Sequence, residues 1–103
     1  MKLIIRNNSL GLRLSQEEIE TLRTQGVVTA RTGFPGGREF RYELESSPAS
    51  VAPAAFFSDN VLTVRLPETA VLAWVTTGQD AIEGEQVLVD GEKLTIVVGK
   101  DAG

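Results

Sequence analysis

The stretch NSLGLRLS at residues 8–15 decides the fold, because a related stretch, NVLTVRLP, follows 52 positions later at residues 60–67. The alignment of the two copies continues without a gap for 19 positions, of which six are identical, and it ends on Gly26 and Gly78. Self-similarity at a fixed spacing indicates that one supersecondary unit occurs twice. The repeat therefore predicts two copies of the same arrangement of strands and helix.

Copy one is predicted to contain two strands, a helix and a closing hairpin. Leucines alternate with other residues in 10–14, as in a strand with one buried face. Ser15 and Glu18 form a capping-box pattern that starts a helix, and Gly26 suits its end. The full set of elements expected in this copy is strands over 3–6 and 10–14, a turn at Asn7-Asn8, a helix between Ser15 and Gly26, and a hairpin over 27–45.

Copy two follows the same order. Pro67 suits a first helical turn, Val71, Trp74 and Val75 would form the buried stripe, and Gly78 would end the helix. Asp90-Gly91 between apolar runs is a strong hairpin signal. The expected elements are strands over 55–58 and 62–66, a turn at Asp59-Asn60, a helix between Pro67 and Gly78, and a hairpin with strands over 86–89 and 94–98.

The predicted fold class is mostly β with two helices (α+β), built from two ββαββ units. Residues 1–103 are expected to form a single domain, with repeat one at 1–45, a linker at 46–53 and repeat two at 54–98. A unit of this size is too small to bury its own faces. We therefore expect the two copies to pack about a pseudo-twofold axis into one intertwined barrel, so that the monomer is a pseudo-dimer.

Composition excludes several classes of function. The chain has no His and no Cys, which removes the commonest general base, the commonest metal ligand and the cysteine nucleophile. No apolar run reaches about 18 residues, the length of a membrane span. The composition predicts a soluble, cytoplasmic protein that is not an enzyme, has no cofactor or metal site, and does not bind membranes.

The repeated stretches resemble a known family. NSLGLRLS at 8–15, LTVRLPE at 62–68 and EQVLVDGEKLTI at 85–96 are similar to the turn, strand and closing hairpin of AbrB/MazE-type proteins. The resemblance implies an internally duplicated, swapped-hairpin barrel in which a single chain supplies both halves. The layout is also similar to small bacterial proteins of about this length that have no assigned function.

The same resemblance implies DNA binding by residues on and beside the second strand of each copy: Arg6, Asn8, Ser9, Arg13, Asn60 and Arg65. The charge distribution bears on this hypothesis in both directions. Residues 1–42 carry a net charge of +3 and residues 43–103 a net charge of −7, which favours a charged partner surface. The total of −4, with an isoelectric point near 4.8, is unlike the basic footprint of a DNA-binding domain.

Two alternatives remain open beside the DNA-binding regulator. One is a protein-interaction or structural module that has lost DNA binding, in which Phe34 at a hairpin tip could anchor a protein partner. The other is an enzyme that uses carboxylates alone, which requires several acids with raised pKa values in one pocket. DNA binding is favoured if Lys2, Arg6, Arg13 and Arg65 share one face, and the protein module if Glu39, Glu43 or Asp59 neutralise it.

Overall fold

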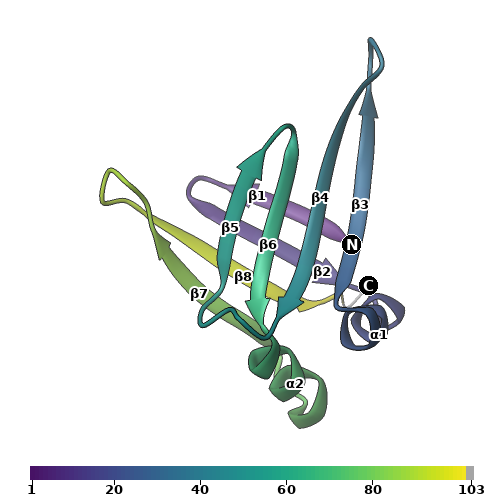
Figure 1. The fold of residues 1–103 in the computed structure, drawn as a ribbon, viewed down its shortest axis with the longest axis vertical. Coiled ribbons are helices and arrows are strands. Elements are labelled where there is room, and N and C mark those ends of the chain that lie inside the picture. The colour runs from purple at the N-terminus through teal and green to yellow at the C-terminus, as the bar shows by residue number, and fades with distance from the viewer. Residues whose placement is uncertain (102–103) are drawn as a thin grey trace.

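The computed structural model describes residues 1–101, which form eight strands and two helices (Figure 1). Both repeats contribute a hairpin, a helix and a second hairpin, in that order. The elements are β1 (Lys2–Arg6), β2 (Ser9–Leu14), α1 (Gln16–Gln25), β3 (Val27–Phe34), β4 (Arg38–Ser47), β5 (Ala54–Ser58), β6 (Val61–Pro67), α2 (Glu68–Thr77), β7 (Ala81–Val87) and β8 (Lys93–Lys100).

The hairpins of the two halves are exchanged between two four-stranded sheets. Sheet A has the order β1-β2-β8-β7, and sheet B has the order β3-β4-β6-β5. Each sheet thus takes one hairpin from each half, joined by a central parallel pair, β2 with β8 and β4 with β6. In Figure 1 the two sheets cross, both helices lie at one end, and the hairpin tips point away from them. The α+β class is confirmed.

Local sequence signals set the turns and the helix ends. Asn7, Asp59 and Asn60 have positive φ angles of 50°, 52° and 64°, which Asn and Asp tolerate better than most residues. Helix α1 begins with both hydrogen bonds of the Ser15–Glu18 capping box, as predicted. Both helices end on a glycine in the left-handed region, at Gly26 and Gly78.

The core lies between the two sheets and under the helices. It is built from the inward side chains of the central strands together with two helix stripes. Trp74 of α2, which the sequence places in the core, is fully buried, and its indole Nε1 donates to the carbonyl oxygen of Asp80 at 3.4 Å. The residues of the core are Leu10, Leu12, Leu14, Ile19, Leu22, Val28, Leu44, Leu62, Val64, Leu66, Val71, Trp74, Ile82, Ile96 and Val98.

Strands β4, β7 and β8 differ most from the sequence prediction, and β8 runs to Lys100, two residues beyond its expected end. Strand β7 spans Ala81–Val87 rather than 86–89, and Val89 lies fully exposed in the turn that follows. Glycine and glutamates weaken the strand pattern of this segment, so its pairing with β8 depends on tertiary structure. Strand β4 continues to Ser47, two residues beyond the expected end, because its last residues pair with β6.

Candidate functional site

The outward side of the β1–β2 hairpin carries a set of basic side chains. Strand alternation buries Leu10, Leu12 and Leu14 and turns their neighbours outward. The register places Arg6 opposite Ser9 and Lys2 opposite Arg13 on the same side of sheet A. We call this surface the basic face and define it as Lys2, Ile4, Arg6, Ser9, Gly11 and Arg13.

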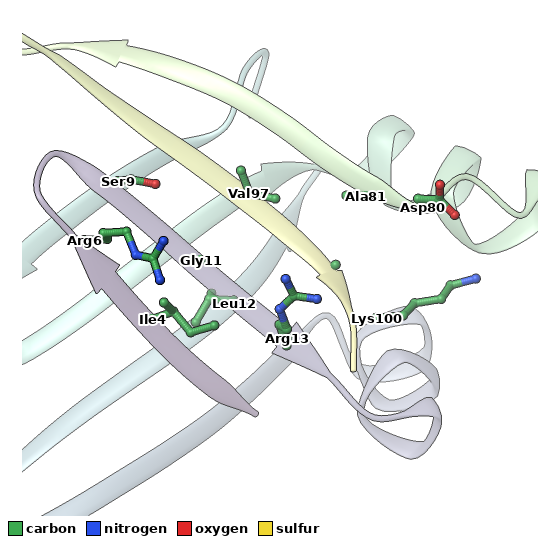
Figure 2. Close-up of a pocket in the computed structure, with 11 residues that line it drawn as sticks. Ile4, Arg6, Ser9, Gly11, Leu12, Arg13, Asp80, Ala81, Val97 and Lys100 are labelled. Atoms are coloured by element: carbon green, nitrogen blue, oxygen red, sulfur yellow. The ribbon is translucent and has the colours of Figure 1, made fainter. Parts of the chain in front are cut away.

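A shallow hollow of about 600 Å³ lies on the basic face and extends over β8. Figure 2 shows the guanidinium groups of Arg6 and Arg13 above the hairpin, on either side of Gly11. Gly11 and Gly99 both line the hollow, where they leave strand backbone uncovered. A Cβ at either position would meet its nearest atom at 3.6 Å, an ordinary contact, so neither packing nor backbone strain requires glycine there.

The two arginines that flank the hollow have no acidic partner in the described part of the chain, residues 1–101. Within residues 1–101, Arg6 and Arg13 form no ion pair and no side-chain hydrogen bond, and both are exposed. In contrast, Nζ of Lys2 lies 3.3 Å from Oδ2 of Asp101. The same outer face of sheet A also carries acidic residues, since Asp80 lines the hollow and Glu83 and Glu85 of β7 lie opposite Val97 and Thr95 of β8.

The corresponding face of sheet B is neutralised. Arg65 Nε donates to Glu45 Oε1 at 2.5 Å, and its guanidinium lies 4.8 Å from the centre of the Phe56 ring. Glu39 binds both Arg41 and Arg31 at 2.7 Å. Hydrogen bonds from Arg41 and then from Arg31 lower the pKa of the Glu39 carboxyl. Each of these arginines therefore already has a carboxylate partner.

The structure brings together some of the predicted site residues and separates others. Arg6, Ser9 and Arg13 share the basic face. Asn8, in the adjoining turn, donates from Nδ2 to Glu92 Oε2 at 2.5 Å. Arg65 lies on sheet B opposite Ala54, at the end of the β5–β6 hairpin away from the turn that contains Asn60, so the expected single surface is divided between two sheets.

The remaining predicted contact, Phe34, ends β3 at the tip of the β3–β4 hairpin. Its side chain is 54% exposed and lies outside the core cluster. The role of Gly11 and Gly99 in shaping the hollow was not predicted from the sequence. A glycine inside an otherwise alternating strand was the available signal, because such glycines often mark a close approach to the backbone.

Acidic residues do not gather into a catalytic or metal-binding cluster in the part of the chain that the structure describes. No group of three or more of them is placed to hold a metal ion in residues 1–101. The carboxyls with a clear pKa shift in that range, Glu18, Glu20 and Glu39, all have a lowered pKa. The helices α1 and α2 are both too short to cross a membrane.

The comparisons with known proteins give a family but no characterised relative. No curated protein and no solved structure matches the chain. Residues 1–102 match the family described as a family of unknown function (DUF7009). Since this match covers nearly the whole sequence, the chain belongs to the DUF7009 family.

Proposed function

We propose that this protein is a non-catalytic binding module whose basic face contacts the phosphate backbone of DNA. The observation that carries the proposal is the exposure of Arg6 and Arg13, without acidic partners in residues 1–101, on either side of a hollow floored by glycine. Guanidinium groups bind phosphate oxygens through paired N–H donors. Gly11 leaves strand backbone uncovered between the two arginines, beside Ile4, and a backbone phosphate can approach closely there.

The exchange of hairpins supports a finer assignment of the fold. In the proposal, the two halves of this chain form a duplicated, AbrB-like swapped-hairpin barrel. The domain division at 1–45, 46–53 and 54–98 belongs to the same proposal. It is supported by the central parallel pairs, which join a first hairpin of one half to a last hairpin of the other.

The proposed contact is one-sided, unlike that of a symmetric dimer. Arg65 is the counterpart of Arg13, but Glu45 and the Phe56 ring already hold its guanidinium. A single face with two unpaired arginines offers few phosphate contacts, and the net charge of −4 opposes approach to DNA. Binding is therefore expected to be weak and to decline steeply with added salt.

The test is a salt titration of binding to a short random-sequence duplex, followed by fluorescence anisotropy. Arg13→Ala should reduce the slope of log K against log salt by about one unit, since each phosphate contact contributes about 0.9 to it. Arg65→Ala is the matched control and should leave the slope unchanged. Absence of binding by the unaltered chain at low salt would reject the DNA proposal.

A second candidate function is a protein-interaction module, and a different observation favours it. Strand β1 is an edge strand of sheet A, and both Ile4 and Ile5 are exposed, at 42% and 62%. An exposed apolar edge strand is a template for pairing with another chain. This edge supports a more specific inference.

A further inference from the structure

We propose that the free edge of β1 accepts an extended acidic segment of a partner protein as a fifth strand of sheet A. The proposal goes beyond DNA binding, because it relies on the backbone of the edge rather than on the hollow. It rests on three observations: the direction of the backbone groups of β1, an asymmetry between β1 and β5, and the charges beside the edge.

Hydrogen bonding fixes which backbone groups of β1 point away from the sheet. Asp101 N donates to Leu14 O at 2.8 Å, and Thr95 N of β8 donates to Asn8 O at 2.9 Å. Both acceptors are even-numbered residues. The even-numbered residues of β2 therefore face β8, and the odd-numbered ones face β1. Their partners on β1 are its even-numbered residues. The N–H and C=O groups of Leu3 and Ile5 consequently point outward.

The equivalent edge of the other sheet is occupied in part by a side chain. Ala55 of β5 corresponds to Leu3 in the repeat. Ala55 N donates to Gln86 Oε1 at 2.7 Å, and Gln86 Nε2 donates to Ala55 O at 3.3 Å. One side chain thus satisfies both outward groups of Ala55, as a neighbouring strand would do.

The edge of β1 lacks this latch. Ile82 of β7 pairs with Val98 as Val28 of β3 pairs with Leu44, so β7 and β3 can be aligned on Ile82 and Val28. In this alignment Thr32 stands at the position of Gln86. The exposed Thr32 side chain makes no hydrogen bond, and within residues 1–101 nothing bonds to the outward groups of Leu3. The fold therefore occupies the outward groups of Ala55 on one edge and leaves those of Leu3 on the equivalent edge available.

The side chains beside the edge specify the chemistry of the added strand. Lys2 and Arg6 stand at the two ends of the outer side of β1, with Ile4 between them. The inner side presents Leu3 and Ile5. Cross-strand pairs of opposite charge stabilise a sheet, and like charges destabilise it. The fitting segment carries acidic residues outward, at least at its ends, and apolar residues inward.

A second copy of β1 does not meet these requirements. An antiparallel pair of β1 strands would place Lys2 of each copy near Arg6 of the other, which is unfavourable. The opposite edge of sheet A has the fitting pattern in β7, where Glu83 and Glu85 alternate with Ile82 and Gln86. Gln86 already holds that strand against β5, so the β7 of a second copy is engaged within its own fold.

The experiment uses a labelled peptide that alternates Glu and Val, titrated into the full chain and followed by fluorescence anisotropy. A peptide that alternates Lys and Val is the charge control. We expect the acidic peptide to bind and the basic one not to bind. Hydrogen exchange should then show new protection at the amides of Leu3 and Ile5, because strand addition hydrogen-bonds them.

The variant Ile5→Pro removes the outward N–H without breaking a bond between β1 and β2. It should weaken peptide binding by about tenfold or more, equivalent to at least 1.4 kcal/mol. Phe57→Pro makes the corresponding change on β5 and is the matched control, with no expected loss. If Ile5→Pro does not fold, Lys2→Glu with Arg6→Glu provides the second variant, and it should reverse the preference between the two peptides.

Several outcomes would overturn the proposal. They are an equal loss of peptide affinity in Phe57→Pro, new hydrogen-exchange protection at amides outside β1, and no binding of the acidic peptide at millimolar concentration. A concentration-dependent dimer that disappears in Ile5→Pro would identify a second copy as the occupant instead. Ile5→Pro retains Arg6 and Arg13, so it should keep the salt slope for DNA, and failure of the strand proposal is distinguishable from failure of DNA binding.

Discussion

Arg65 faces Glu45 across the parallel pair of β4 and β6, whereas its counterpart Arg13 faces Gly99 across β2 and β8. The two arginines occupy the same position in the repeat. The residue opposite differs, a carboxylate that binds the guanidinium at 2.5 Å in one case and a glycine in the other, and Arg65 also lies over the ring of Phe56. A glycine in place of a glutamate is thus one difference between the basic face and the neutral one.

Removing the glutamate should give the neutral face a free cation. In Glu45→Gln the ion pair to Arg65 is lost, so Arg65 becomes available to a phosphate. The salt slope for duplex DNA should increase by up to about one unit, measured by anisotropy. Glu43→Gln removes the same charge from the same face, but Glu43 hydrogen-bonds Thr63 rather than an arginine, and it is the control. An unchanged slope in Glu45→Gln would mean that Arg65 does not reach DNA.

A glutamate at position 99 should remove the contribution of Arg13 to DNA binding by the basic face. Gly99→Glu would place a carboxylate opposite Arg13, and a Cβ at this position has room, 3.6 Å from Ala81. The salt slope should fall as far as it does in Arg13→Ala, while the urea midpoint stays close to that of the unaltered chain. Gly99→Gln has nearly the same shape without the charge. If both variants weaken binding equally, filling the hollow matters and the charge does not.

The sequence predicts local features of this fold better than its long-range pairings. The ends of α1 follow from Ser15 and Gly26, because capping depends on residues only a few positions apart. The difference between Arg13 and Arg65 depends on which residue of a distant strand lies opposite each arginine. No periodicity encodes that parallel register. The first residues of strand β7 were missed for a related reason, since its glycine serves a tertiary contact.

That glycine, Gly84, should be among the least replaceable residues of the sheets. A Cβ there would lie 2.7 Å from Cγ of Pro53, whose ring cannot move as a flexible side chain does. We expect Gly84→Ala to lower the free energy of unfolding by about 1–3 kcal/mol. Gly11→Ala is the control, because its Cβ meets only an ordinary contact, and it should be neutral or raise stability by about 0.5 kcal/mol. Urea denaturation of the two variants tests the difference.

The capping box of α1 should make stability depend on pH. Burial raises the pKa of Glu18, but hydrogen bonds from the Met1 ammonium and the Ser15 backbone outweigh it, and the net pKa lies below the ordinary value for a glutamate. A carboxyl with a lowered pKa stabilises the fold above its unfolded pKa, and this contribution is lost as pH falls through the folded pKa. Denaturation from pH 6 to pH 3 should show a smaller decline in Glu18→Gln. Glu17→Gln, in the same turn, should keep the full decline.

The bond between Gln86 and Ala55 should protect the β5 edge in the same way that a partner strand would protect β1. Gln86→Ala removes two hydrogen bonds of a partly buried side chain, which should lower the free energy of unfolding by about 1–2 kcal/mol. Hydrogen exchange at the Ala55 amide should accelerate, while that of the core strands should follow only the global change. Gln79→Ala is the control, since Gln79 makes one exposed bond, to Ala81 O.

The β5 edge that Gln86→Ala opens still lacks cations, because Ala54 and Ser58 stand where β1 has Lys2 and Arg6. An acidic peptide should therefore bind the variant at one site, and a second site of equal affinity would show that backbone pairing alone, without charge, selects the strand.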